Sequence, residues 1–299
     1  MQGKALWGRL ALLGAAMIWG SSFFVMKNAV DGIPVFLLLA IRFTIGCVLL
    51  SLVCVKKWRH CCRRLLWHGA VVGVLLFLAY TAQTYGLKDT TPGKNAFLTA
   101  VYCVLVPFVN WALLRRRPSR WNWLAALMCL GGIGLVSLDG SLSMNRGDAL
   151  TLLGGVCYAL HLVAVSRFGE EDYPVLLTAV QFGASALCCW GCSLGFETMP
   201  AALPQGAWGE LIYLAVFATT LALLMQNVGQ SVTPAAPAAI LLSLESVFGV
   251  LFSVVCYGEA VTLRLAMGFL LIFLAVVASE THFSFLRRGK TSVDRGTPA

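Results

Sequence analysis

Long apolar stretches alternate with short polar or Gly/Pro-marked turns along all 299 residues of the chain. Each stretch holds about 20 residues, the length that a helix needs to cross a hydrocarbon core of ~30 Å. We therefore predict ten membrane-spanning helices with no soluble domain between them. Their approximate ranges are 7–28, 33–54, 65–87, 94–114, 121–139, 148–167, 173–194, 207–229, 236–257 and 262–282. Residues 283–299 are polar and basic and are predicted to form a cytoplasmic tail.

The ninth stretch, residues 233–259, repeats the fourth, residues 91–117. Both have the same length, both begin with Thr-Pro, and Ala96 corresponds to Ala238. Weaker similarity follows at offsets of 139 to 143 residues, so that Gln83 corresponds to Gln226. Each copy contains five spans, an odd number, so the second copy must insert upside down relative to the first. The prediction is an all-α integral membrane protein with ten transmembrane helices as two inverted five-helix repeats, at residues 7–139 and 147–282. Such repeats are characteristic of secondary transporters, which bind their substrate near the midplane between the halves.

Composition and charge fit a membrane protein and argue against a nucleic-acid partner. Hydrophobic residues make up 59% of the chain and charged residues 12%, whereas soluble proteins average roughly 25% charged residues. The net charge of +9 comes from short basic clusters between the apolar stretches, a pattern that sets membrane topology. One side collects Lys4, Arg9, Lys56, Lys57, Arg59, Arg63, Arg64, Arg115, Arg116, Arg117, Arg120, Arg167, Arg287, Arg288, Lys290 and Arg295. The other side collects only Lys27, Lys88, Lys94, Arg146 and Arg264. We therefore expect a multi-pass protein of the cytoplasmic (inner) membrane with both termini in the cytoplasm.

Glu245 is the one ionisable residue inside the ninth span, about ten residues from its start. An isolated carboxylate at membrane depth is costly, so a functional role is the default hypothesis. It would bind a cationic group or exchange a proton; the alternative is a glutamate that only packs between helices. Its repeat counterpart is Cys103. His161, whose counterpart is Ser22, is a second candidate for proton exchange or a structural hydrogen-bonding group. Arg42, whose counterpart is Gln181, could extend to the outer interface or neutralise an acid, and is interpreted mainly as structural.

Further polar and aromatic residues lie inside the spans and are candidates for a mostly apolar binding pocket with a few placed polar groups. The full set of predicted substrate-binding residues is Trp19, Ser22, Tyr80, Gln83, Tyr102, Tyr158, His161, Gln226, Asn227 and Glu245. Aromatic faces would attract an ammonium group. The alternative is that the aromatic residues anchor the helices at the membrane interface and that the amides hold helices together.

Other residue clusters indicate no chemistry. The 11 cysteines lie mostly in apolar stretches, where a thiol behaves as a small hydrophobe. His60-Cys61-Cys62 with His68 has metal-ligating residue types, but the spacing fits no standard zinc pattern. No metal and no cofactor is therefore predicted. Glu259 precedes Thr262 at the start of the last span, where it is expected to support that helix start. No His-Glu-x-x-His or oxyanion-forming motif occurs, so the chain is not expected to be an enzyme.

Several short motifs occur in a specific order along the chain. They are Met17-Ile18-Trp19-Gly20-Ser21-Ser22-Phe23, Ala40-x-Arg42-Phe43, Tyr102-x4-Pro107, Leu244-Glu245-Ser246 and Gly258-Glu259. Together they resemble the drug/metabolite transporter (DMT) superfamily in its ten-helix EamA-type form, over about residues 7–280. The resemblance implies two inverted five-helix repeats around a central cavity, and a family that mainly exports amino acids and other small metabolites. One departure is that Arg115-Arg116-Arg117 stands where the first repeat of the family often has Gly-Glu.

The leading hypothesis is a secondary transporter that exports a small metabolite by alternating access, either an amino acid or a related amphiphilic or amine compound. Proton exchange at Glu245 or His161 is one way in which transport could be coupled. The alternatives are an uncoupled facilitator, a lipid-translocating protein or a structural membrane protein. The expected partners are a small-molecule substrate, the lipid bilayer and, for coupled transport, protons; a monomer and a homodimer both remain open.

Overall fold

The computed structural model describes residues 2–115, 117–138, 144–168, 174–232 and 235–281. Within these ranges the side chains of residues 2–5, 114, 166, 174, 227–228, 230–232, 235–240 and 280 are not described. The predicted tail at residues 283–299 lies outside the described residues, and so do Arg116 and the Thr-Pro pair at 233–234.

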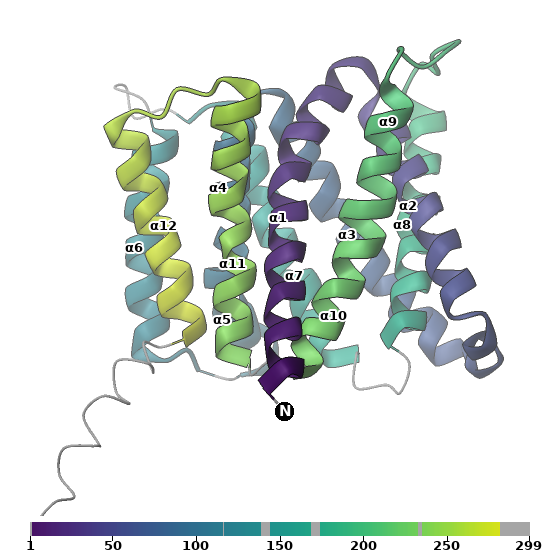
Figure 1. The fold of residues 1–299 in the computed structure, drawn as a ribbon, viewed down its shortest axis with the longest axis horizontal. Helices are drawn as coiled ribbons and strands as arrows, with labels where there is room; N and C mark the ends of the chain where they lie inside the picture. The colour runs from purple at the N-terminus through teal and green to yellow at the C-terminus, as the bar shows by residue number, and fades with distance from the viewer. Residues whose placement is uncertain (1, 116, 139–143, 169–173, 233–234, 282–299) are drawn as a thin grey trace, which may run out of the picture.

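The described part of the chain is helical, without a β-strand, and its helices form ten rods (Figure 1). In the first half these are α1 (Gln2–Gly32), α2 (Val35–Val53), α3 (Arg63–Lys88), the consecutive α4 (Pro92–Thr99) and α5 (Val101–Leu114), and α6 (Arg120–Ser137). In the second half they are α7 (Arg146–Phe168), α8 (Pro174–Phe196), the run α9 (Ala207–Ile212), η2 (Tyr213–Leu221) and α10 (Ala222–Val232), the run α11 (Ala235–Phe252) and η3 (Ser253–Tyr257), and α12 (Leu263–Thr281). A short 3₁₀ segment, η1 (Val55–His60), joins α2 to α3.

The rods match the ten predicted spans, and the predicted fold class is confirmed. Seven of the described helical segments are long and apolar enough to cross a membrane, and residues 241–257 and 263–279 form shorter apolar helices. Both α1 and α12 have their chain-terminal ends at the lower edge of Figure 1. This follows from ten crossings, because an even number of spans returns the chain to the side from which it started.

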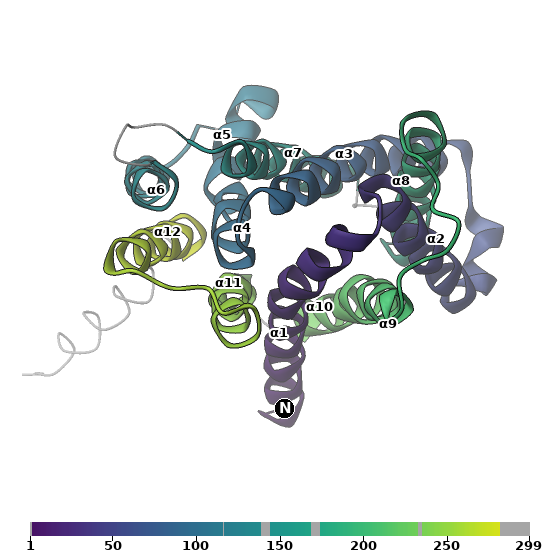
Figure 2. The same ribbon diagram turned by 90° about the horizontal axis from the view of Figure 1, so that it is seen from above.

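Packing between the rods shows the symmetry of an inverted repeat. The second rods of the two halves, α2 and α8, pack against each other, and so do the fifth rods, α6 and α12 (Figure 2). The third rod of the first half, α3, packs against α7, while its counterpart α10 packs against α1. Likewise α1 packs against α11, and α5 packs against α7. The contact of α3 with α7 is therefore equivalent to that of α10 with α1, and the contact of α1 with α11 is equivalent to that of α7 with α5.

Close approach of α1 and α11 depends on a glycine. A Cβ atom at Gly20 would lie 2.4 Å from the Phe248 Cβ atom and 2.9 Å from the Glu245 carbonyl oxygen. Backbones can approach this closely only where a side chain is absent, which is a common device in membrane helix pairs. The glycine in the sequence Trp-Gly-Ser-Ser thus brings the backbone at Glu245 against α1.

The segments η2 and α5 depart from regular α-helical geometry. In the π-helical segment η2, the hydroxyl groups of Thr219 and Thr220 donate to carbonyl oxygens five residues earlier, at 2.8 and 3.0 Å. Segments of this kind are frequent at functional sites. In α5, Pro107 has no N–H to offer the Cys103 carbonyl four residues earlier. The Ser279 hydroxyl on α12 donates to that carbonyl oxygen instead, at 3.4 Å.

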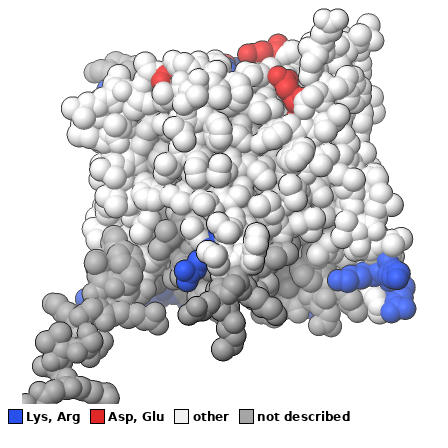
Figure 3. Space-filling model, in the orientation of Figure 1, with Lys and Arg blue, Asp and Glu red and all other residues white. Residues whose placement is uncertain are grey.

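The two ends of the bundle carry opposite charges. The face with the ends of α1 and α12, here called the basic face, carries Lys and Arg in the loops that join α2 to α3 and α5 to α6. The other end, here called the acidic face, carries the described residues Asp31, Asp89, Asp148, Glu197, Glu210 and Glu259, together with Lys27, Lys88, Lys94, Arg146 and Arg264. In Figure 3 the blue side chains gather at the lower edge and the red ones at the upper edge.

Candidate functional site

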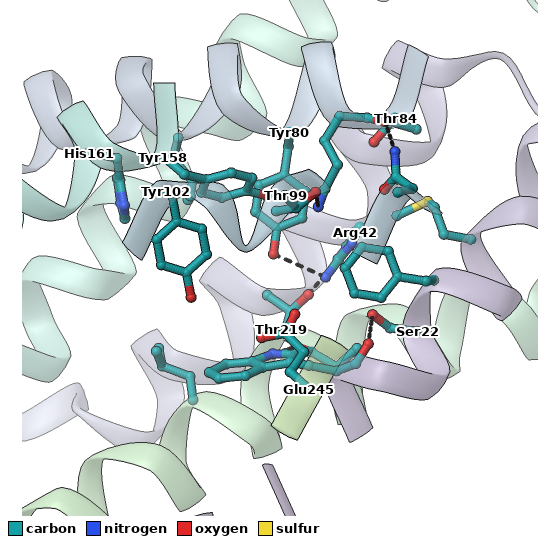
Figure 4. A pocket seen from close by; sticks show the side chains of 18 of the residues that line it. Ser22, Arg42, Tyr80, Thr84, Thr99, Tyr102, Tyr158, His161, Thr219 and Glu245 are labelled. Atoms are coloured by element: carbon teal, nitrogen blue, oxygen red, sulfur yellow. Dashed lines mark hydrogen bonds between the residues drawn. The ribbon is translucent and has the colours of Figure 1, made fainter. Parts of the chain in front are cut away.

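A cavity of about 210 Å³ lies between the two halves, at the middle of the bundle. Helices of both repeats line it, and Figure 4 shows ten of its polar and aromatic residues with labels. Nine of the ten residues predicted to bind substrate line this one cavity: Trp19, Ser22, Tyr80, Gln83, Tyr102, Tyr158, His161, Gln226 and Glu245. The tenth, Asn227, has a side chain outside the described residues. Their role in substrate binding stays a prediction.

Glu245 reaches the cavity from α11, the ninth rod. Its side chain is half-buried, and it makes no hydrogen bond or ion pair with any residue that the structure describes. A carboxylate in an apolar bundle without a protein partner is unfavourable unless it meets water, a proton or a ligand. The cavity is the place where such a partner can be supplied.

Arg42 also lines the cavity, from the opposite repeat, and is only 2% exposed. Its Nε–H donates to the Thr219 hydroxyl at 2.6 Å, and one terminal nitrogen donates to the Tyr80 hydroxyl at 3.4 Å. The guanidinium carbon lies 4.7 Å from the centre of the Tyr80 ring, which places the cation over an aromatic face. No ion pair joins Arg42 to a described carboxylate. Neutral groups therefore hold the side chain at the cavity wall, and it does not extend to the membrane interface.

A polar chain runs from the cavity wall toward the acidic face. The Tyr158 hydroxyl donates to the Gln83 side-chain oxygen at 3.0 Å, and the Gln83 amide donates to the Thr99 hydroxyl at 3.0 Å. The Asn95 amide donates to the Gln83 carbonyl at 3.2 Å and to the Thr151 hydroxyl at 2.7 Å. Each bond joins different helices, so the chain fixes α3, α4 and α7 relative to one another.

Aromatic rings form much of the remaining wall. The Tyr80 ring contacts Phe43 edge-on, with ring centres 5.2 Å apart, and lies 5.4 Å from Tyr158. Tyr102 continues the row at 6.0 Å from Tyr158. On α1, the Trp19 indole N–H donates to the Ala218 carbonyl at 2.8 Å, so the π-helical segment η2 supplies a carbonyl acceptor to α1. The wall is mostly apolar, as small-ligand sites usually are.

His161 is buried and pairs with its neighbour on α8. One ring nitrogen lies 3.3 Å from the Gln181 side-chain oxygen. This pairing is what a structural histidine would make, although the ring also borders the cavity (Figure 4). Its role in proton exchange stays a prediction.

Several cavity residues were not in the predicted set: Arg42, Thr84, Asn95, Thr99, Gln181 and Thr219. Arg42 carried a signal, because a cation about eight residues inside a span is costly unless it faces a polar interior. Thr219 carried none, because only the π-helical geometry of η2 turns it toward Arg42. Among the described residues no group of three His, Cys, Asp or Glu side chains is placed to hold a metal.

One expectation for a residue outside the cavity is wrong. Glu259 does not support the start of its own following helix, α12. It accepts hydrogen bonds from the Thr91 hydroxyl and the Gly93 backbone N–H, at the start of α4. The Thr262 hydroxyl instead accepts from the Leu265 N–H, at 3.3 Å, at the start of α12. The partners of Glu259 lie in the other repeat. Gly93 is 166 residues away in sequence, so local sequence could not indicate this contact.

Comparison with known proteins gives a consistent result. An uncharacterized transporter of Archaeoglobus fulgidus is 32% identical over 274 residues, which cover 92% of this chain and 86% of the relative. The uncharacterized transporter YetK of Bacillus subtilis is 27% identical, covering 86% of this chain and 81% of YetK. The uncharacterized inner membrane transporter YedA of Escherichia coli K12 is 27% identical over 71% of each chain.

A protein of known crystal structure shares the fold, with a TM-score of 0.66 at 22% identity over 94% of this chain and 98% of its own. The sequence pattern of the EamA-like transporter family matches twice, at residues 6–138 and 145–280. These two matches cover nearly all ten rods and divide the chain between α6 and α7. The chain therefore belongs to the EamA-like transporter family.

Proposed function

We propose that this membrane transporter is a secondary transporter that exports a small zwitterionic metabolite, such as an amino acid, with proton exchange at Glu245 as the coupling step. The substrate would occupy the cavity between the repeats and be exposed to each face in turn as one repeat moves against the other. The basic face would be cytoplasmic, because Lys and Arg accumulate on the cytoplasmic side of membrane proteins.

The observation that carries this proposal is a basic and an acidic side chain that line one cavity without forming an ion pair with each other. Arg42 and Glu245 come from different repeats, and no described ion pair joins them. A zwitterion satisfies both: its carboxylate can accept from the planar guanidinium, and its ammonium can donate to the glutamate. The row of aromatic rings would contact the apolar part of the substrate and add cation–π attraction for the ammonium.

The same geometry supports proton coupling. With the cavity empty, Glu245 has no described protein partner, so a proton is the simplest ligand to neutralise it. When a substrate ammonium arrives, the carboxylate is better left ionised. Substrate and proton would therefore compete for one carboxylate, which is the condition for exchanging one for the other.

A thermal-shift screen on the purified protein tests the substrate class. We expect amino acids to raise the melting temperature more than two analogues do, the decarboxylated amine and the acid that lacks the amino group. Transport of a hit is then measured in proteoliposomes. If the amine alone raises the melting temperature as much as the amino acid does, Arg42 does not contribute to substrate recognition. If only lipids raise the melting temperature, the proposal is excluded.

The Glu245→Gln variant in the same proteoliposomes tests the coupling. We expect it to lose flux driven by a pH gradient while exchange of substrate for substrate continues at a reduced rate. If pH-driven flux persists, Glu245 is not the coupling group. If the parent protein shows no response to pH at all, the transporter is an uncoupled facilitator.

A further inference from the structure

Glu259 connects the two repeats at the acidic face. It follows η3 in the second repeat and is only 8% exposed. Its carboxylate accepts from the Thr91 hydroxyl and, at 3.0 Å, from the Gly93 N–H, both in the first repeat. The Ser253 hydroxyl of its own repeat also donates to it. The N-terminus of a helix favours a negative charge, because its first N–H groups have no partner within the helix.

Asp148, at the start of α7, binds the same segment of the first repeat. It is fully buried, accepts from the Thr90 hydroxyl at 2.5 Å, and lies 3.8 Å from the Lys94 ammonium. Residues 90–94 are thus held between two carboxylates of the second repeat. We call Asp148, Glu259 and residues 90–94 the acidic clasp.

Gly93 makes the clasp tight. A Cβ atom at this position would lie 2.5 Å from a carboxylate oxygen of Glu259. The approach of the carboxylate to the helix start therefore requires a residue without a side chain. The clasp is a built contact between repeats, since buried groups on both sides fit each other.

The inverted repeat places the equivalent positions of both carboxylates on the basic face, where both are arginine. At the offset of 139, Asp148 corresponds to Arg9; at the offset of 142, Glu259 corresponds to Arg117. Both arginine side chains are exposed. The sequence thus retains the architecture of the two ends but reverses the charge at the two positions that form the clasp.

Two buried polar atoms lie beside the clasp without a partner among the described residues. The Asn95 side-chain oxygen and the Thr84 hydroxyl are buried without a hydrogen-bond partner among the described residues. Both residues line the acidic-face half of the cavity. Exposure to water would give both groups a hydrogen-bond partner. Opening of the bundle at the acidic face is therefore favoured here unless another contact between the repeats opposes it.

We propose that the acidic clasp is a latch that holds the acidic-face ends of the two repeats together, so that the resting protein is closed at the acidic face. The basic face has arginines in the equivalent positions, so the two carboxylates of the latch have no counterpart there. The proposal rests on the alternating access of the proposed function, and it adds which side is closed at rest. With the basic face in the cytoplasm, an export substrate would enter the resting cavity from inside the cell.

Hydrogen–deuterium exchange of the ligand-free, full-length protein in lipid nanodiscs tests the latch. In Glu259→Gln and Asp148→Asn we expect faster exchange at residues 90–94 and, farther away, at residues 83–88 of α3 and 23–27 of α1, which border the acidic-face half of the cavity. The expected increase is at least about tenfold in rate, because sub-global opening governs exchange there. Slower exchange at residues 65–73, near the basic face, should accompany it if the two ends alternate.

Glu197→Gln is the matched control. Glu197 is also an acidic-face carboxylate of the second repeat that accepts from a helix start of the first repeat, but it binds α2, at the Phe36 and Leu37 N–H groups at 2.8 and 2.9 Å, and not α4. We expect faster exchange at the start of α2 only. An effect of the clasp variants confined to residues 90–94 and 253–259 would overturn the latch, because the contact would then stabilise only its own surroundings.

A milder variant protects the test against misfolding. Thr91→Val removes one hydrogen bond to Glu259, together with the hydroxyl that accepts from the Lys94 N–H at 3.4 Å, and keeps both carboxylates. We expect a smaller change with the same distribution along the chain, and unchanged exchange would overturn the latch. The measurement needs no substrate, so the latch can be tested even if no zwitterion binds. Conversely, if the latch proposal fails, the proposed binding cavity is not affected.

Discussion

The two repeats of this transporter share one architecture but differ in where they carry charge. At equivalent positions, the first repeat has Cys103 where the second has Glu245, and the second has Gln181 where the first has Arg42. Each repeat therefore contributes one charged residue to the cavity, of opposite sign and on a different rod. The packing of the rods tolerates this exchange, because cysteine and glutamine also fit a half-buried wall. An inverted repeat fixes where a site can form, while single substitutions decide its chemistry.

The same contrast holds at the ends of the bundle. In the acidic clasp two carboxylates join the repeats, and the basic face has exposed arginines at the equivalent places. Basic residues on one side also orient the chain in the membrane. On the basic face the arginines at these positions thus contribute to the orientation of the chain, and the carboxylates of the acidic clasp have no equivalent there.

Substitution of the two cavity charges should have the largest effect. We expect Arg42→Gln and Glu245→Gln each to weaken binding of a zwitterionic hit by about 10- to 100-fold, because a hydrogen bond to a charged group contributes roughly 1.5–3 kcal/mol. Isothermal titration measures the dissociation constants. The repeat-equivalent changes, Gln181→Ala and Cys103→Ala, are the controls and should alter affinity much less. If Cys103→Ala weakens binding as much as Glu245→Gln, the two repeats contribute alike and the comparison fails.

Loss of the acidic clasp should lower stability more than loss of charge on the basic face. Glu259→Gln leaves the Thr91 hydroxyl and Gly93 N–H with a weaker acceptor, and we expect unfolding to become easier by about 1–3 kcal/mol. Arg117→Gln changes an exposed side chain and should stay within about 0.5 kcal/mol. Thermal unfolding in one detergent compares the two. Equal losses would mean that the clasp contributes nothing specific.

The outcome for the candidate site shows what sequence can supply. Hydrophobic length predicted all ten rods, and the matched glutamines, Gln83 and Gln226, both line the cavity. Partners across the repeats could not be predicted. The bond between Arg42 and Thr219 joins residues 177 positions apart and depends on the π-helical geometry of η2. No local pattern encodes such a pairing, so Arg42 was interpreted as structural.

Gly93 offers a smaller test of how closely the repeats approach at the acidic face. A methyl group there would meet the Glu259 carboxylate at 2.5 Å, so we expect Gly93→Ala to destabilise by about 1–3 kcal/mol through overpacking. Gly191 on α8 has nothing within 4 Å of its would-be Cβ atom, so Gly191→Ala is the control. Alanine there should be neutral or stabilising by about 0.5–1 kcal/mol, because glycine weakens a helix interior. A tolerated Gly93→Ala would show that the carboxylate can move aside without cost.

The smallest effect is expected where the repeats are most alike. Trp19 and Tyr158 are equivalent at the offset of 139, and each uses its polar atom to bind the neighbouring third rod of the other repeat: Trp19 donates to Ala218 and Tyr158 donates to Gln83. Trp19→Phe and Tyr158→Phe each remove one such bond while keeping an aromatic ring in place. We expect each to lower stability by about 1 kcal/mol, the net contribution of a typical hydrogen bond. Thermal unfolding measures both. A loss of stability several times larger for Trp19→Phe would mean that the π-helical segment η2 depends on this donor more than the regular helix α3 depends on Tyr158. Equivalent residues of the two repeats would then contribute differently to stability.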